Sequence, residues 1–315
     1  MLLRASLGLY DYLQGAITPS PTNFLQIINL RHLLYVLRGF MDAPSHFFED
    51  FSQVAALWIH EISRTVIDRY PDANQRDAIF EKVKELASGA FKVREKYLPR
   101  NHHEIAYCYG CPDARRAYRP VPADEAVLQN MMTDALTEYN TRSAGRQQLD
   151  VVFFGSVIEK VLKINRALRP AGAHTILVAH EGSGSFELVK VAVKMSDWED
   201  EALYEKDSEL EEDWRVHLKE IMAKSSGERR TRHVLHVEER DISSRELLEA
   251  LDAIAAHGEL FQLYSREEME LMTSTHRQRL GPLLATDLTS AQVKDLIRQQ
   301  LRDDFTMLIQ LNPRS

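Results

Sequence analysis

The sequence predicts a fold of the α/β plus all-α class, with a helical N-terminal part followed by an α/β part built on a parallel sheet. Two observations support this prediction. In the first half, apolar residues recur at steps of three and four, the spacing of one helix face. In the second half, short apolar segments alternate with amphipathic ones, a pattern typical of parallel sheets with crossover helices.

Apolar stripes and caps mark the helices of the first half. A stripe over residues 47–70 predicts one helix, and Asp72, followed three residues later by a glutamine, predicts the cap of the next. Residues 99–122 contain four prolines and predict a break in regular structure. Pro122 suits the first turn of another helix. A further helix is expected over residues 149–168, ending before a proline.

Strands and helices alternate in the second half. The predicted strands are 175–179, 234–237, 260–264 and 305–311. Helices are predicted over 186–195 and 211–224, and after capping pairs that begin with Ser243 and Thr289.

Composition excludes several classes of protein. Of the 315 residues, 44% are hydrophobic and 27% charged, as in ordinary globular proteins. The formal net charge of -8 argues against a dedicated nucleic-acid binder, which carries a basic surface. No apolar run reaches the length of a membrane span, and residues 1–13 predict a helix rather than a signal peptide. Two cysteines suit a reducing compartment.

The segment 177–187 has the order of a phosphate-binding loop: a strand, a glycine-containing turn and a helix. The residues of the turn are Gly182, Ser183, Gly184 and Ser185. An intact loop has a lysine that reaches the terminal phosphates, followed by a serine or threonine that holds Mg²⁺. Here Ser185 stands at the lysine position and Phe186 at the hydroxyl position. An ordinary structural turn is the alternative interpretation of these four residues.

Charge makes this loop unfavourable for a triphosphate. Glu181 and Glu187 add negative charge, and each close contact with phosphate would cost about a few kcal/mol at an effective dielectric constant of about 20. The helix dipole offers only about 0.3–1 kcal/mol at an exposed site. We therefore expect weak ATP binding and no useful hydrolysis.

Longer segments resemble dynein heavy chains. Residues 29–39 are similar to the start of the small helical subdomain of dynein AAA+ modules, and 57–70 resemble the family's L-W-x-H-E-x-x-R-V-x-x-D-R-L helix. Residues 138–168 are similar to the linker and first helix of the fourth module, and 212–214 match the helix after the loop. The resemblance covers residues 7–313, and it looks more axonemal than cytoplasmic.

The resemblance implies a division of the chain into two parts. Residues 1–120 would be the helical lid subdomain of a third AAA+ module with its connecting segment. Residues 121–315 would be the large α/β subdomain of a fourth module, ending before its own lid. The implied function is a structural or regulatory segment of a microtubule motor ring, with ATP and Mg²⁺ as cofactors of the parent family. Its partners would be the remaining modules and dynein subunits, with microtubules contacted only indirectly, in the cytoskeleton of a cilium or flagellum.

The family's functional positions carry over one at a time. Glu239 falls at the acidic position that ends the second core strand and holds Mg²⁺ through water. Arg240 occupies the neighbouring place, where a polar group would orient the attacking water. Asn312 matches the sensor position that can hydrogen-bond a γ-phosphate. Arg31 matches the lid arginine that reaches the nucleotide of the preceding module. Phosphoryl transfer depends on exact placement of such groups, which the longer Glu239 and the cation at Arg240 both disturb.

Other interpretations compete with this one. Cys108 and Cys111 form a single C-x-x-C motif after His102 and His103. A zinc site requires two correctly spaced ligand pairs, so the sequence favours two incidental thiols over a metal site. A stand-alone, non-catalytic interaction protein derived from a dynein heavy chain is one functional alternative. A working P-loop NTPase is another, and it requires saturable Mg-ATP binding. The dynein assignment itself requires residues 175–195 to form a strand-to-helix crossing at the edge of a parallel sheet.

Overall fold

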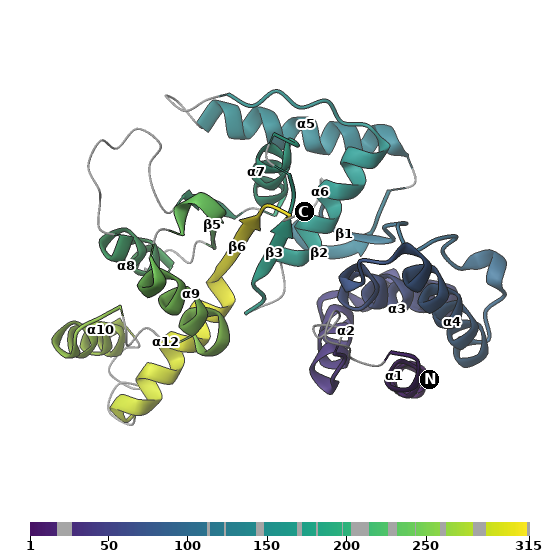
Figure 1. Cartoon of the computed structure of the whole chain (residues 1–315), viewed down its shortest axis with the longest axis horizontal. Coiled ribbons are helices and arrows are strands. Elements are labelled where there is room, and N and C mark those ends of the chain that lie inside the picture. Colours follow the sequence, from purple (N-terminus) through teal and green to yellow (C-terminus); the bar gives the residue numbers. More distant parts are fainter. Residues whose placement is uncertain are drawn as a thin grey trace. The chain divides into compact units, whose positions relative to one another are not determined.

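The chain forms two compact units, Met1–Arg166 and Ala167–Ser315, in a computed structural model. The structure describes residues 1–17, 27–111, 114–122, 124–142, 148–168, 172–180, 182–196, 198–202, 214–225, 232–242, 244–258, 263–279 and 288–313. The first unit is helical with a small hairpin, and the second has a parallel sheet with helices (Figure 1). The predicted fold class is therefore confirmed.

The first unit contains six α-helices and one antiparallel hairpin within its described residues. The helices are α1 (Leu2–Ala16), α2 (Leu30–Asp42), α3 (Phe51–Thr65), α4 (Ala73–Phe91), α5 (Glu125–Arg142) and α6 (Gly155–Leu168), the last two residues of α6 lying beyond the unit. Short 3-10 turns are η1 (Ser45–Phe47), η2 (Ile67–Arg69) and η3 (Glu95–Tyr97). The hairpin pairs β1 (Tyr107–Cys111) with β2 (Ala114–Pro120).

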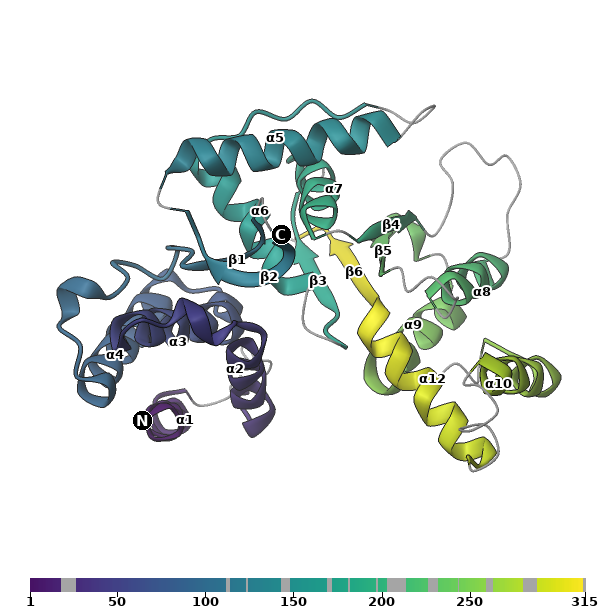
Figure 2. The ribbon, with the colours of Figure 1, turned by 180° about the vertical axis from the view of Figure 1, so that it is seen from behind.

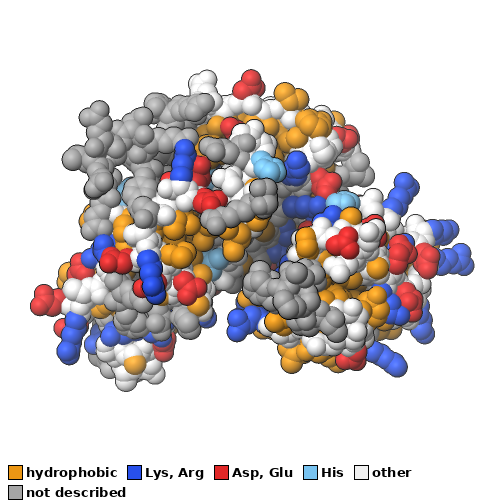
Figure 3. Space-filling model, in the orientation of Figure 1, with side chains coloured by type: hydrophobic (Ala, Val, Ile, Leu, Met, Phe, Trp, Pro, Cys, Tyr) orange, Lys and Arg blue, Asp and Glu red, His pale blue; other side chains and the backbone are white. Residues whose placement is uncertain are grey.

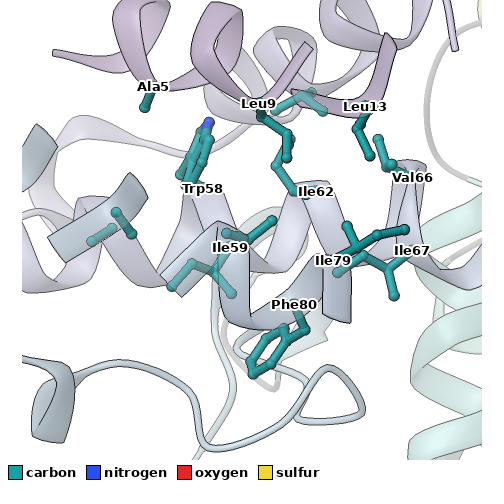
Figure 4. Close-up of a cluster of buried hydrophobic side chains, with 14 of the residues drawn as sticks. Ala5, Leu9, Leu13, Trp58, Ile59, Ile62, Val66, Ile67, Ile79 and Phe80 are labelled. Atoms are coloured by element: carbon teal, nitrogen blue, oxygen red, sulfur yellow. The ribbon is translucent and has the colours of Figure 1, made fainter. Parts of the chain in front are cut away.

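The core of this unit lies between α1, α3 and α4. Trp58 of α3 is fully buried, and its indole N–H donates to Ser6 Oγ of α1 at 3.0 Å. Leu9 and Leu13 of α1 point towards the side of α3 that carries Ile62 (Figure 4). From Val54 onward, the apolar stripe predicted over residues 47–70 packs into this core, as a hydrophobic helix face should, whereas Phe51 is 57% exposed.

A buried charge pair holds α6 to α3. Arg166 Nε donates to Glu61 Oε1 at 3.0 Å, and Arg166 Nη2 donates to Glu61 Oε2. The Tyr118 hydroxyl of β2 also donates to Glu61, whose side chain has no exposed surface. A Cβ added at Gly39 of α2 would lie 2.1 Å from Glu61 Oε2, so α2 closes over the carboxylate. Four elements thus meet at one buried carboxylate.

Several element boundaries in the first unit differ from the sequence prediction. The helix expected over 47–70 is shorter, because the Asp50 side chain accepts from the amides of Ser52 and Gln53 and caps α3 there. The predicted break over 99–122 contains the β1–β2 hairpin. The predicted helix start at Pro122 was wrong: α5 begins at Glu125, where Asp124 accepts from the Ala126 amide.

The first part of the predicted helix 149–168, residues 149–154, is not helical. Helix α6 begins only at Gly155. The Asn140 side chain bonds both the amide and the carbonyl of Leu149 at 2.9 Å, which takes the backbone groups that a helix would use. Asp72 does cap α4, accepting from the Asn74 amide at 3.1 Å.

The second unit is built on a four-stranded parallel sheet with the order β3-β6-β5-β4. The strands are β3 (Thr175–Val178), β4 (Glu199–Ala202), β5 (His233–Glu238) and β6 (Phe305–Leu311). The described helices are α7 (Ser185–Met195), α8 (Trp214–Ser225), α9 (Arg245–His257), α10 (Arg266–Arg279) and α12 (Ser290–Asp304), with the 3-10 turn η4 (Glu239–Asp241). Figure 2 shows β6 between β3 and β5.

The core of the second unit joins β5 and β6 to α8, α9 and α12. Leu235 and Met307 on the strands are fully buried against Leu247, Val293 and other apolar residues. Strand β5 is buried along nearly its whole length, as expected for a central strand of a parallel sheet. The sheet thus has β5 and β6 at its centre and β3 at one edge.

Most predicted elements of the second unit are present. Residues 186–195, 234–237 and 305–311 lie in α7, β5 and β6, and Thr289 forms a capping box with Gln292. Helix α9 is capped by Ser244 within the described residues, whereas the predicted cap, Ser243, lies outside them. Of the predicted strand 260–264, residues 260–262 are also outside them, and Leu263 and Tyr264 lie in a turn and a bend rather than a strand.

The division into two compact units falls within α6, after Arg166. The predicted subdomain boundary lies between residues 120 and 121, ahead of α5. Arg166 pairs with Glu61 of α3, and nearly all of α6 belongs to the helical unit, together with α5, which precedes it. The assignment of residues 1–120 and 121–315 to two family subdomains remains a prediction.

Candidate functional site

The turn between β3 and α7 has the backbone path of a phosphate-binding loop. Gly182 and Gly184 have φ angles of 75° and 76°, in the left-handed region that glycine adopts without steric cost. The Ala179 amide donates to the Leu311 carbonyl of β6 at 3.0 Å, and the Ser183 amide donates to the His180 carbonyl at 3.2 Å. The loop therefore starts against the central strand β6 and turns back on itself before the helix.

Helix α7 begins directly after the loop. Gly184 is its N-cap residue, and the Leu188 amide donates to the Gly184 carbonyl at 3.2 Å. Ser185 is 9% exposed and supplies no cation. A Cβ added at Gly184 would meet Glu187 Oε2 at 3.9 Å, so this carboxylate lies beside the first turn of the helix. The free amides of a helix N-terminus attract anions, and Glu187 already provides one.

The side chain at the hydroxyl position lies against the sheet. The ring of Phe186 stacks on the imidazole of His236 in β5, with centroids 5.5 Å apart and planes at 28°. Lys190 Nζ, one turn further along α7, lies 4.7 Å from the centre of the same ring. His236 is 3% exposed, whereas Phe186 is partly exposed, so the stack covers the imidazole from the side of α7. The sequence identified Phe186 as a departure from the motif but gave no signal for its partner.

The residues predicted at the acidic and sensor positions, Glu239 and Asn312, meet at the ends of neighbouring strands. The Asn312 amide, just after β6, donates to Glu239 Oε2, just after β5, at 2.8 Å. The chain after β5 is also closed locally: the Glu238 amide donates to Asp241 Oδ2 at 2.8 Å, and Arg240 pairs with Glu238 Oε1 at 2.8 Å. The cation of Arg240 is thus held by the preceding glutamate.

Parallel strands explain why these residues come together. The loop residues 182–185 follow β3, Glu239 follows β5 and Asn312 follows β6. The carboxyl ends of adjacent parallel strands all lie at the same end of the sheet. Arg31 belongs to the first unit, in the first turn of α2, where its amide donates to Asn29 Oδ1 at 3.0 Å. Its role as a lid arginine remains a prediction.

The C-x-x-C motif lies in the β1–β2 hairpin. Cys108 is buried on β1, opposite Arg119, and Cys111 pairs with Ala114 past an irregularity in the register. Among the residues that the structure describes, histidine, cysteine, aspartate and glutamate side chains form no group of three or more suited to a metal ion.

The surface carries both signs of charge. Basic and acidic side chains are interspersed over the visible face of the molecule (Figure 3). None of the described helices is both long enough and apolar enough to cross a membrane.

Known proteins match this chain along its length. Residues 149–315, just over half of the chain, match the family described as "P-loop containing dynein motor region D4". The chain is 25% identical over 285 residues to dynein axonemal heavy chain 2 of Homo sapiens, covering 87% of this chain and 6% of that protein. It is 26% identical over 305 residues to dynein axonemal heavy chain 3 of Mus musculus, covering 92% and 7%.

A third relative extends the match to nearly the whole chain. Dynein axonemal heavy chain 1 of Rattus norvegicus is 23% identical over 321 aligned residues, covering 99% of this chain and 7% of that protein. The chain therefore spans only 6–7% of the length of these relatives. The family match begins at Leu149 and includes the loop, Glu239 and Asn312. The crossing from strand β3 to helix α7 lies at the edge of a parallel sheet, as the resemblance required. The chain belongs to the dynein heavy-chain family.

Proposed function

We propose that this chain is a structural and regulatory segment of a dynein motor ring whose nucleotide site does not hydrolyse ATP. The observation that carries the proposal is the loop between β3 and α7. It retains two glycines at positive φ and a helix start, but position 185 has no ammonium group and the hydroxyl position holds Phe186. The scaffold is that of an ATP site, and the groups that grip phosphate and Mg²⁺ are missing.

The residues around the loop do not fit Mg-ATP. The Phe186 ring lies against His236, so no oxygen is available there as a ligand for Mg²⁺. Glu187 lies beside the first turn of α7, where it would repel a phosphate by about a few kcal/mol at an effective dielectric constant of about 20. Glu239 accepts a hydrogen bond from the Asn312 amide instead of facing a free site. Each of these features supports a site that has a structural role and does not catalyse ATP hydrolysis.

Binding of Mg-ATP to the full chain tests this proposal. Calorimetric titration of the wild-type chain should give no saturable heat with millimolar Mg-ATP, and no phosphate release above a protein-free blank. The double substitution Ser185→Lys and Phe186→Thr restores both missing groups and should produce measurable binding. A wild-type chain that binds Mg-ATP in the micromolar range would refute the proposal.

The place in a motor ring needs a separate test. The relatives are named as axonemal heavy chains, and one is part of a "flagellar inner arm I1 complex" in Chlamydomonas reinhardtii. We therefore place this chain in the cytoskeleton of a cilium or flagellum, with other dynein modules and subunits as partners and microtubules as an indirect one. A tagged chain should sediment with dynein after salt extraction of axonemes. Recovery only in fractions without dynein would favour a stand-alone interaction protein.

A further inference from the structure

The strand ends around the loop are joined by contacts within the protein. The Ala179 amide joins the start of the loop to β6, and Glu239 joins the end of β5 to Asn312 after β6. Phe186 joins the first turn of α7 to β5, which is two places away from β3 in the sheet. The loop, the helix that follows it and strands β5 and β6 are therefore linked without any ligand.

An intact site makes one of these links through a metal ion. There the hydroxyl in the first helical turn and the acidic residue at the strand end both hold Mg²⁺, directly or through water, so the bound ion ties the helix to the strand. In this chain the same two elements, α7 and β5, are tied by the stacking of Phe186 on His236. His236 is only 3% exposed, and Phe186 is half-buried against it.

We propose that the Phe186–His236 stack is a built-in brace that replaces the Mg-nucleotide bridge and fixes the loop in its folded form without ligand. This inference rests on the proposed function, because a loop that bound Mg-ATP would need no such substitute. It adds that the stack takes over the structural role of the phosphate and Mg²⁺ ligands that the loop has lost. The site would then present the same surface to neighbouring parts of the motor at every nucleotide concentration.

The chemistry of the stack suits this role. An offset aromatic pair keeps a fixed geometry without a ligand, whereas a metal bridge requires the ion and its nucleotide to be present. Lys190 places its ammonium group 4.7 Å from the Phe186 ring, a cation–π distance, and is itself 4% exposed. The brace therefore includes a second contact from the same helix and does not depend on the exposed end of the loop.

Hydrogen exchange of the full chain tests the brace. Phe186→Ala should raise the exchange rate of amides 182–188 about three- to tenfold, which corresponds to the usual strength of an aromatic pair. His236→Phe keeps two rings and should leave these rates at the wild-type value. Val178→Ala is the matched control: it shortens an apolar side chain that is 60% exposed next to the loop, and should not change them.

Two further variants keep the test decisive if Phe186→Ala loosens the whole unit, as faster exchange in α12 would indicate. Phe186→Leu keeps apolar volume but removes the ring, so a rise confined to amides 182–188 supports the brace. In a chain that already carries His236→Leu, the same change should add less than about twofold, because the pair is already broken. Wild-type exchange rates in Phe186→Leu would overturn the brace.

The two proposals fail in different ways. If Mg-ATP slows exchange of amides 182–188 in the wild-type chain, the proposed inactive site is wrong, and the brace with it. If Mg-ATP has no effect but Phe186→Ala and Phe186→Leu leave the loop as protected as in the wild type, the inactive site stands and the brace is overturned. Faster loop exchange in both variants, with no effect of Mg-ATP on the wild type, supports both.

Discussion

The two units use charged residues in opposite settings. In the helical unit, Glu61 is fully enclosed, and it accepts from Arg166 and Tyr118. In the α/β unit, Glu239 lies at the end of a strand with a partly exposed side chain and accepts from a backbone amide. The first arrangement depends on burial and specifies how helices meet, whereas the second links the ends of two neighbouring strands, β5 and β6.

The Glu61 carboxylate shapes the ionisation of its neighbours. Burial raises the pKa of the Tyr118 hydroxyl well above its usual value, and the adjacent Glu61 carboxylate adds to the rise. Burial alone would lower the pKa of Arg166, but the Glu61 carboxylate holds it well above its usual value. Arg166 therefore stays charged at any physiological pH. A charge of this kind is structural, and the difference between the units can be tested by removing single groups.

The largest effect should follow removal of the buried carboxylate. Glu61→Ala leaves Arg166 charged and buried, so the free energy of unfolding of the helical unit should fall by about 3–5 kcal/mol. Urea unfolding followed by the fluorescence of the three tryptophans, with hydrogen exchange to assign the unit, measures it. Glu81→Ala, which removes a 68% exposed partner of Lys84, is the control and should cost less than about 1 kcal/mol.

The same pair offers a compensating variant. Glu61→Leu combined with Arg166→Met removes both charges and should recover most of the lost stability, because well-packed apolar residues replace a buried pair at little cost. Tyr118→Phe in that background removes the hydroxyl that would otherwise lose its acceptor. If Glu61→Ala unfolds no more easily than the Glu81→Ala control, the contrast between the units is wrong.

Acid should weaken both units through one histidine in each, of which His60 is buried and His174 is half-buried. Burial, with the charge of Arg302, lowers the pKa of His174 from 6.5 to about 4, and burial with Arg64, Arg166 and Lys163 lowers the pKa of His60. A lowered histidine pKa means that the folded state favours the neutral ring, so its contribution is present above pH 6.5 and is lost as pH falls towards about 4.

The expected size for His174 is about 2–3 kcal/mol between pH 7 and pH 4. His174 Nδ1 accepts from the Met307 amide at 3.1 Å, and an asparagine oxygen can take over that role without titrating. Comparing urea midpoints of the wild type and His174→Asn at both pH values isolates this group. If the urea midpoints of the wild type and His174→Asn fall by the same amount between pH 7 and pH 4, His174 is not the group that weakens the unit in acid.

A smaller effect should come from the close approach of α2 to Glu61. Gly39→Ala places a methyl group 2.1 Å from Glu61 Oε2, and the strain should cost about 1–3 kcal/mol in the helical unit. Gly89→Ala in α4 is the matched control, because no atom lies within 4 Å of the added methyl. That change should stabilise by about 0.4–1 kcal/mol, as glycine in a helix interior is unfavourable. Equal responses of the two glycines would show that Glu61 can move aside.

The sequence was informative wherever a pattern is local. The stripe around Trp58 predicted a buried helix, the Thr289 capping pair predicted the start of α12, and two glycines predicted the loop. It did not predict the β1–β2 hairpin, because prolines and a C-x-x-C obscure the alternation of a short strand. The partners of Glu61 and Phe186 were also missed, since both contacts join residues 50 or more positions apart.

The smallest effect is expected at the strand ends. Glu239→Ala removes the acceptor of the Asn312 amide, but water can replace it at this exposed position, so unfolding should change by only about 0.5 kcal/mol. Exchange of the Asn312 amide should nevertheless become faster, because its intramolecular bond is lost. Glu239→Gln keeps an oxygen acceptor and should restore the slow exchange. A loss above about 2 kcal/mol in Glu239→Ala would place this carboxylate in the same structural class as Glu61, because only a desolvated group loses that much when its partner is removed.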